Sequence, residues 1–223
     1  MLIIKISIEN METFECIKSR RTVRKYDKKD VPHEIIGQII FAGSQAPSAG
    51  NMQPWVFIVV KEEETKKELS TAALRQDFIF KAPVVIVVAA DLERSGDKYG
   101  ERGKKFYCIQ DTAAAIENML LAAHDLGLGA CWVGAFEEEK VKGILSMPDR
   151  LRPVGLITIG HPLPYDKEKK PKRLPFENIT FLEKYGQIYP DWMEHPAEEW
   201  KFKIEPLESH VKKLKEKLTS RKK

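Results

Sequence analysis

Cysteine is scarce in this chain of 223 residues, which has three cysteines and no CxxC pair. Cys16, Cys108 and Cys131 are odd in number and far apart, which argues against a disulfide framework or a zinc site and favours a reducing cytoplasm. Cys131 lies in an apolar run, so we expect a small core residue, with a catalytic cysteine as the alternative. The five histidines show no HExxH or similar spacing, so no metal site is predicted.

The chain also lacks a long apolar run. Its start, "MLIIKISI", is interrupted by Lys5 and has neither the cationic region nor the cleavage site of a signal peptide. No other stretch is long enough to span a membrane, so we expect a cytoplasmic protein without membrane contacts. The net charge of +4 is small and dispersed, which gives no support for a nucleic-acid partner but allows a local anion site.

The usual nucleotide fingerprints are missing too. No GxGxxG follows the first strand, and no GxxxxGK[ST] occurs anywhere. Apolar periodicity and turn residues nevertheless predict a chain that mixes helices and strands without strict alternation. Helices are expected at 11–19, 32–43, 62–74, 111–126 and 137–146, strands at 55–60, 82–90, within 127–136 and at 153–160, and a mobile charged excursion at 91–106.

Four separated stretches have compositions suited to one ligand. "RRTVR" (20–24) places three guanidinium groups within five residues, and "KKPKR" (169–173) adds a second cationic cluster. Arginine suits phosphate because its planar fork binds two oxygens at once. "APSAGNMQPW" (46–55) carries more short polar side chains than a turn needs, as expected for a loop that holds a flat, polar-edged ligand.

The fourth stretch, "GLGACWVGAF" (127–136), surrounds a short apolar core with three glycines, which is typical of close approach by a backbone or a ligand. Taken singly, each stretch has an ordinary alternative: a solvated charge run, a turn, or a strand ended by turns. Together they favour a phosphorylated, planar cofactor.

These stretches, with the helix "DTAAAIENMLLAAHDLGLGACWVGAF" and "LITIGHP", resemble the nitroreductase family of FMN-dependent oxidoreductases in the right order from about 11 to 179. The resemblance implies an α+β fold with a central, mainly antiparallel sheet flanked by helices, and an intertwined homodimer with FMN at the subunit interface. The implied domains are an FMN-binding nitroreductase-like domain at 11–180 and a C-terminal extension at 181–223 with a basic end. Residues 1–10 have no counterpart.

The resemblance also implies roles for particular residues. The ribityl phosphate would be bound by Arg20, Arg21, Thr22, Arg24, Lys172 and Arg173, and the ring by Pro47, Ser48, Ala49, Asn51 and Gln53. Val133, Gly134 and Ala135 match the segment whose backbone faces the reactive edge of the flavin, and some relatives carry an acidic residue at the position of Gly134. We predict a substrate lid that includes Tyr99, Phe106 and Tyr107, for which core aromatic residues are the alternative.

The implied activity is ping-pong hydride transfer from NADH or NADPH through flavin N5 to a nitroaromatic, quinone or flavin-like acceptor, with no side chain required as a catalytic acid or base. The alternatives are a specialised branch (a reductive dehalogenase, a dehydrogenase of a peptide-derived substrate, or a flavin-fragmenting enzyme) and a flavin-binding protein without turnover. An RNA-binding protein is disfavoured because its basic tail lacks interleaved aromatic residues.

The end of the chain is predicted to serve the dimer. Leu207, Val211, Leu214 and Leu218 form a thin apolar stripe among lysines, without the aromatic anchor of a membrane-surface helix. The preceding aromatic residues would be a liability in water. We therefore expect 185–202 to pack across the partner subunit.

Overall fold

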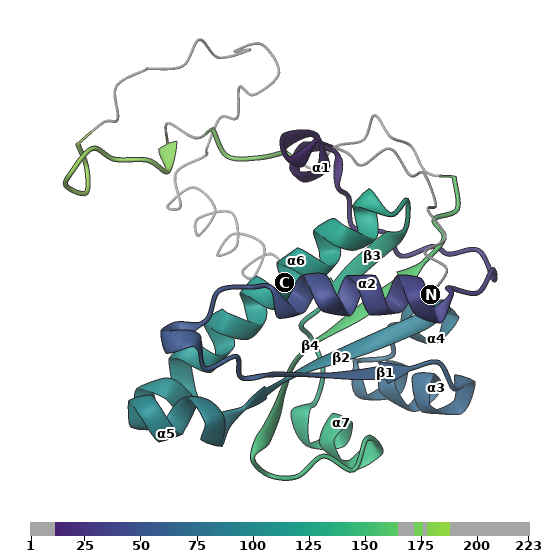
Figure 1. Cartoon of the computed structure of the whole chain (residues 1–223). Coiled ribbons are helices and arrows are strands. Elements are labelled where there is room, and N and C mark those ends of the chain that lie inside the picture. The colour runs from purple at the N-terminus through teal and green to yellow at the C-terminus, as the bar shows by residue number, and fades with distance from the viewer. Residues whose placement is uncertain (1–11, 165–171, 176–177, 188–223) are drawn as a thin grey trace, which may run out of the picture. The chain divides into compact units, whose positions relative to one another are not determined.

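Four antiparallel strands in the order β1-β2-β4-β3 form the sheet of this protein (Figure 1), which confirms the predicted α+β class. The computed structural model describes residues 12–164, 172–175 and 178–187. It divides into two compact units, Met1–Tyr165 and Asp166–Lys223. The strands are β1 (Trp55–Val60), β2 (Val84–Asp91), β3 (Gly129–Val133) and β4 (Leu151–Gly160).

Helices cover both faces of the sheet: α2 (His33–Ser44) and α6 (Cys108–Asp125) lie on one face, and α3 (Glu63–Ala72) and α7 (Glu138–Ile144) lie on the other (Figure 1). Side chains alternate along β2, so Ile86 and Val88 pack against α2 and α6, whereas Val85 and Val87 pack against α3 and α7. β2 is buried along its whole length, as its unbroken apolar sequence predicts. The helices are α1 (Thr13–Ser19), α2 (His33–Ser44), α3 (Glu63–Ala72), α4 (Phe78–Lys81), α5 (Leu92–Arg102), α6 (Cys108–Asp125) and α7 (Glu138–Ile144), with a 3-10 turn, η1 (Ala49–Asn51), and a π-helix, η2 (Gly103–Tyr107).

α6 is the longest described helix and the centre of its layer. Its buried stripe includes Ile116, Met119 and Ala123 at the spacing of one helix face. Gly43 lets α2 come close, because a Cβ at that position would lie 2.6 Å from Met119 Cγ. α6 contacts α1, α2 and β1, and it therefore links the segment before α2 to the strand that follows α2.

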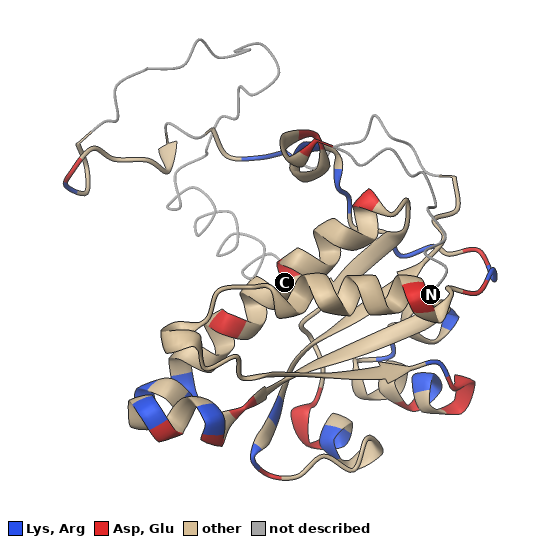
Figure 2. Ribbon diagram, in the orientation of Figure 1, with Lys and Arg blue, Asp and Glu red and all other residues tan. Residues whose placement is uncertain are grey.

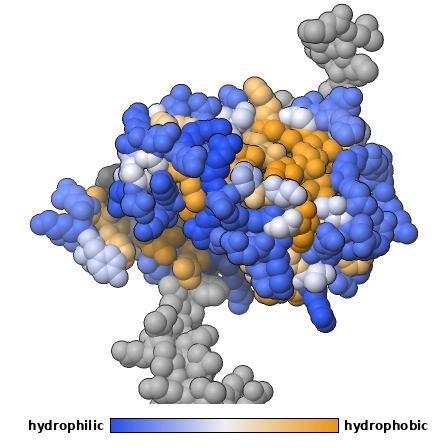
Figure 3. Space-filling model, turned by 90° about the horizontal axis from the view of Figure 1, so that it is seen from below, coloured by the Kyte–Doolittle hydropathy of each residue, from blue (hydrophilic) through white to orange (hydrophobic). Residues whose placement is uncertain are grey.

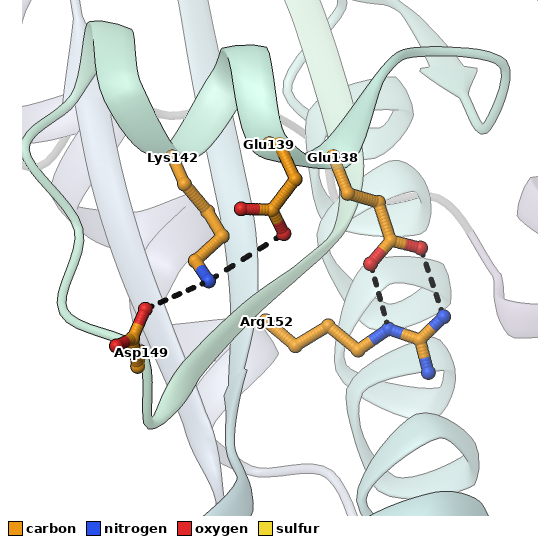
Figure 4. Close-up of polar contacts among 5 residues, drawn as sticks. All are labelled: Glu138, Glu139, Lys142, Asp149 and Arg152. Carbon is orange, nitrogen blue, oxygen red and sulfur yellow. Dashed lines mark hydrogen bonds and ion pairs between the residues drawn. The ribbon is translucent and has the colours of Figure 1, made fainter.

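Ion pairs fix α7 against the start of β4 (Figure 4). Arg152 donates from Nε and Nη2 to the two carboxylate oxygens of Glu138, at 2.9 and 2.8 Å. Lys142 Nζ lies 3.6 Å from Glu139 and 3.3 Å from Asp149. Figure 3 shows apolar surface among hydrophilic side chains on the face seen from below. The partly buried apolar residues of the core layer beneath α3 and α7 include Val56, Ile58, Phe136, Ile144 and Leu145.

The prediction of a mobile excursion at 91–106 is wrong, because this stretch is helical as α5 and η2. Asp91 caps α5 by accepting a hydrogen bond from the backbone N–H of Arg94 at 3.2 Å. Gly96 and Gly103 are buried, and a Cβ at Gly96 would lie 2.5 Å from Lys104 Cε. Glycine here serves close packing between α5 and η2 rather than mobility.

The second unit is described at 172–175 and 178–187. Phe181 and Tyr185 stack at 4.7 Å between ring centroids, and the backbone N–H of Leu182 donates to the Gln187 carbonyl at 2.9 Å. The apolar stripe at 207–218 and most of the predicted dimer segment 185–202 lie outside the described residues. The boundary predicted at 180/181 therefore stays a prediction.

Candidate functional site

The arginine segment, residues 20–24, lies beside β3. The backbone N–H of Val23 donates to the Ala130 carbonyl at 2.9 Å, and Thr22 forms a parallel bridge with Ala130. Val23 is buried and fits against Gly129, where a Cβ would lie 2.7 Å from the Val23 Cβ. The alternation that buries Val23 leaves Thr22 and Arg24 exposed on the other side.

The three guanidinium groups of this segment differ in their partners. Arg20 Nε lies 3.5 Å from Glu117 Oε1 on α6. Arg21 donates from Nη1 to the carbonyls of Lys18 and Arg20, at 2.9 and 2.7 Å, and so caps the end of α1. Arg24 lies 5.6 Å from the Phe78 ring centroid, and no ion pair joins it to any carboxylate in the described part of the chain. Arg24 is therefore the arginine of this segment that is freest to bind an anion.

Residues 46–54, the polar loop, have an unusual backbone. Gly50, Asn51 and Gln53 have φ values of 53°, 59° and 48°, in the left-handed region that glycine and asparagine tolerate best. Ser48 Oγ accepts a hydrogen bond from the Gln53 backbone N–H at 3.0 Å. Gln53 Nε2 in turn donates to Asn51 Oδ1 at 3.1 Å. The predicted ring-binding side chains thus hold one another on an exposed turn, after Pro47.

Asp111, near the start of α6, lies behind the polar loop and was not predicted from the sequence. Its Oδ1 accepts a hydrogen bond from the backbone N–H of Ala49 at 3.0 Å, while Oδ2 is buried without a partner among the described residues. The residue is only 6% exposed, and this burial raises the pKa of the carboxyl group. The sequence signal for Asp111 was an acidic residue at the start of an alanine-rich helix. Such a residue is equally well explained by its favourable interaction with the helix dipole.

α5 lies against the other side of the polar loop. Arg94 Nη1 donates to the Gln53 carbonyl at 2.8 Å, and Lys98 Nζ to the Gly50 carbonyl at 3.4 Å. The Tyr99 hydroxyl fills the space where a Cβ of Gly50 would lie. The predicted lid residue Tyr99 is therefore a neighbour of the loop, although on a helix rather than in a mobile stretch.

The other two predicted lid residues belong to η2 and continue this contact. Tyr99 and Tyr107 meet edge to face with centroids 5.1 Å apart, and Phe106 lies 6.0 Å from Tyr107. Tyr107 is partly buried, whereas Phe106 is 46% exposed. The three rings form one aromatic row that begins at Gly50.

The predicted residues at the end of β3 have different surroundings. Val133 is buried in the lower core layer, Gly134 is exposed with no atom within 4 Å of where a Cβ would lie, and the Ala135 carbonyl accepts from Gln76 Nε2 at 3.2 Å. β3 thus carries the arginine segment at its start and Val133–Ala135 at its end. Lys172 and Arg173 are exposed and belong to the second unit, so their approach to the arginine segment stays a prediction.

The site residues therefore fall into two groups. One, the β3 group, contains the arginine segment and 133–135; the other, the loop group, contains the polar loop, Asp111 and α5. On α6, the Arg20 contact at Glu117 and the Ala49 contact at Asp111 are six residues apart, about 9 Å of helix rise. No described hydrogen bond or ion pair joins the arginine segment to the polar loop.

The described residues offer little for metal or thiol chemistry. No cluster of three or more described His, Cys, Asp or Glu side chains is arranged to bind a metal ion. All three cysteines are free and buried, and the burial of Cys131 agrees with its prediction as a small core residue. Burial raises the pKa of the Cys131 thiol, which opposes its use as a nucleophile. None of the described helices has the length and apolar character of a membrane span.

The four-stranded antiparallel sheet with helices on both faces defines this chain as an α+β protein. The profile of the Nitroreductase family matches residues 17–76 and 68–161, and the chain belongs to this family. A protein of Methanothermobacter thermautotrophicus, provisionally named NADH dehydrogenase/NAD(P)H nitroreductase, is 37% identical over 159 residues, which cover 70% of this chain and 80% of the relative.

Two further comparisons agree with this family. The FMN reductase [NAD(P)H] of Bacillus subtilis is 30% identical over 187 residues, which cover 78% of this chain and 74% of the relative. The structure of a nitroreductase family protein from Clostridium novyi NT superimposes with a TM-score of 0.63 at 33% identity and covers 80% of this chain and 97% of that chain. The family resemblance inferred from the sequence is thereby confirmed.

Proposed function

We propose that this protein is an FMN-dependent oxidoreductase that takes electrons from NADH or NADPH and passes them to a nitroaromatic, quinone or flavin-like acceptor. Family membership and the names of the relatives, which include NAD(P)H nitroreductase and FMN reductase, support this proposal. The observation that carries it is the pair of residue groups: one has a guanidinium, that of Arg24, without a carboxylate partner among the described residues, and the other has the polar loop. When bound, the FMN ring supplies the hydride chemistry by accepting hydride at N5 and returning it to the oxidant.

The donor set of the β3 group fits a phosphate. Arg24 has no described carboxylate partner, and Thr22 beside it is exposed. The ion pair between Arg20 and Glu117 is long, at 3.5 Å, so a phosphate can displace Glu117 from the guanidinium. The buried Arg21 Nε has no described partner, although Nη1 of the same side chain caps α1. Arg24 and Arg20 are thus assigned as principal phosphate ligands, with Thr22, Arg21, Lys172 and Arg173 in supporting roles.

The loop group fits the polar edge of a flat ring. Asn51 and Gln53 present amide groups on an exposed turn that Ser48, Asp111 and α5 hold in place. Such a prearranged turn orients the ring without reorganisation when the ring binds. Gly134 adds an exposed backbone without a side chain, which suits close approach of the reactive edge.

We infer that the two groups belong to one site to which two chains contribute. The β3 group of one subunit and the loop group of its partner would enclose each FMN, so that a homodimer holds two cofactors. Apolar side chains on the α1 and α2 side, Phe14, Ile17 and Phe41, are strongly exposed and suit burial against a second copy.

The direct test is the visible spectrum of the purified protein, repeated without oxygen after addition of NADH or NADPH. We expect flavin absorption, its bleaching by at least one nicotinamide, and its return after addition of a quinone. A protein that neither contains nor retains added FMN would overturn the proposal. Retained FMN that no nicotinamide reduces would instead indicate a flavin-binding protein without turnover.

Mixed dimers test the shared site. Chains with Arg24→Ala and chains with Asn51→Ala, each with its own affinity tag, are coexpressed, and the heterodimer is isolated through both tags. If each FMN lies between two chains, the heterodimer keeps one site without either substitution and one with both. Its FMN content should then approach half that of the wild type, above either variant homodimer. If both groups acted within one chain, every site would carry one substitution and no recovery would occur.

A further inference from the structure

α5 and η2 carry an excess of cations beside the aromatic row. Between 92 and 107 there are five Lys and Arg residues and three Asp and Glu residues, a net charge of +2 (Figure 2). Glu101 is already paired with Lys105, at 2.9 Å, one turn along the helix. Among the described carboxylates, none forms an ion pair with Arg102. Arg102, a cation without an acidic partner among the described residues and on the helix that contacts the polar loop, is a candidate for anion binding.

Arg102 is held in place by aromatic residues rather than by acids. Its Nε donates to the Tyr107 hydroxyl oxygen at 2.9 Å. The guanidinium carbon lies 5.0 Å from the Phe106 ring centroid and 5.2 Å from that of Tyr107. Because Nε is occupied, the two Nη groups remain available as a fork with fixed orientation. A guanidinium arranged in this way is suited to bind two oxygens of one phosphate.

The aromatic row connects this guanidinium to the polar loop. Tyr107 contacts Tyr99, and the Tyr99 hydroxyl lies against Gly50. Phe106, 46% exposed, offers a ring on which an aromatic base can stack. Arg102 belongs to the loop group, whereas Arg20 and Arg24 belong to the β3 group. It is therefore a poor candidate for the phosphate of the resident FMN and a good one for a molecule that comes and goes.

We propose that Arg102 binds the phosphomonoester of a nucleotide substrate whose base stacks on Phe106, and so determines which nucleotides the enzyme uses. This inference rests on the proposed function. Two substrates supply that chemistry: NADPH, through its 2′-phosphate, and free FMN as electron acceptor, through its 5′-phosphate. Each has a counterpart that lacks only the phosphate, namely NADH and riboflavin.

The experiment compares these pairs in the flavin-loaded enzyme and in three variants. Arg102→Gln removes the charge, Arg102→Lys keeps the charge without the fork, and Lys105→Gln removes a neighbouring charge that is paired with Glu101. One arm measures kcat/KM for NADPH and NADH with a fixed quinone; the other measures it for FMN and riboflavin with fixed NADH. We expect Arg102→Gln to lower the phosphate-to-dephospho ratio by about tenfold or more in at least one arm, as loss of one charge-assisted bond implies.

Arg102→Lys should lie between the wild type and Arg102→Gln, and Lys105→Gln should keep the wild-type ratios. The arm that responds identifies the substrate. Unchanged ratios in both arms for Arg102→Gln, in enzyme that turns over normally, would overturn the inference and leave the proposed function intact. If no turnover occurs at all, the proposed function fails. Arg102 is then still tested by calorimetric titration with adenosine 2′,5′-bisphosphate and with FMN, with adenosine and riboflavin as phosphate-free controls. If Arg102→Gln changes the affinity for neither phosphate-bearing ligand, the inference is contradicted.

Discussion

Asp111 and Ala49 are joined by a hydrogen bond of 3.0 Å from the Ala49 backbone N–H to Asp111 Oδ1. This bond fastens the polar loop to the start of α6 from within the protein. The second carboxylate oxygen, Oδ2, has no partner among the described residues. A buried carboxylate that is only half satisfied is costly when charged, so the loop is held at the expense of stability.

The free energy of unfolding should therefore depend on the ionisation of Asp111. Burial raises the pKa of this carboxyl above its ordinary value of 3.8, so the folded state binds the proton more tightly than the unfolded state. Its stabilising contribution is present below about pH 3.8 and is lost as the pH rises through the raised pKa. Asp111→Asn keeps an acceptor for Ala49 but cannot ionise. The wild type should lose stability relative to Asp111→Asn as the pH rises above 3.8 and through the raised pKa, measured by urea unfolding.

Asp97→Asn provides the control for that experiment, because it makes the same chemical change at an exposed position of α5. Its difference from the wild type should vary less with pH than that of Asp111→Asn. If the difference in free energy of unfolding between the wild type and Asp111→Asn did not vary with pH, the account of a buried carboxylate with one unsatisfied oxygen would be contradicted.

Gly50→Ala should disturb the polar loop in two ways. Gly50 has a φ of 53°, which costs an L-residue about 1–2 kcal/mol, and the added Cβ would collide with the Tyr99 hydroxyl. We expect a lower free energy of unfolding and weaker FMN retention. The double variant Gly50→Ala/Tyr99→Phe should recover the part due to the Tyr99 hydroxyl, but neither the part due to φ nor the contact with Lys98 Nζ, 2.7 Å from the new Cβ. Gly143→Ala in α7, where no atom lies within 4 Å, is the control and should not destabilise the protein.

Gly129→Ala should displace the arginine segment from β3. The new Cβ would lie 2.7 Å from both Cβ and Cγ1 of Val23, a buried side chain with little rotational freedom. We expect loss of stability together with weaker FMN binding, because Thr22 and Arg24 move with Val23. Val23→Ala in the same chain should restore part of both losses. Strictly additive effects of Gly129→Ala and Val23→Ala in the double-mutant cycle would show that the two residues do not compete for this space.

Much of the fold was predictable because periodicity and composition agree locally. The apolar run at 82–90, the β-branched run at 55–60 and the alanine-rich stripe at 111–126 each predicted one element, and all three elements occur within three residues of the predicted bounds. The excursion at 91–106 was not predictable in the same way. α5 and η2 are charged and together contain three glycines, a composition that does not favour a helix. They depend on packing between α5 and η2, which the local sequence pattern does not reveal.

The residues of the candidate site likewise divide into those that local sequence predicts and those that only tertiary contacts reveal. The arginine segment and the polar loop stand out in the sequence because their residue types are unusual for a turn. Asp111 and Arg102 do not, since each has an ordinary local explanation and acquires its meaning only from its tertiary neighbours. Asp111 is 62 positions from Ala49, and the approach of Tyr99 to Gly50 joins α5 to the loop across the fold. Contacts of that kind depend on tertiary structure.

Arg24 and its neighbour Lys25 offer the sharpest test of phosphate binding. Both are exposed cations on the same segment, but the alternation of an extended backbone places them on different sides of it. Arg24→Ala should weaken FMN binding by roughly one to two decades, the loss expected for one charge-assisted bond to phosphate. Lys25→Ala removes the same charge and should change the affinity by less than about threefold, because a nearby but unbonded surface charge contributes little. Affinity is measured by fluorescence titration of the apoprotein at several salt concentrations. Equal losses for the two variants that vanish together at high salt would mean that the segment attracts FMN only by its overall charge, and that Arg24 does not bind the phosphate directly.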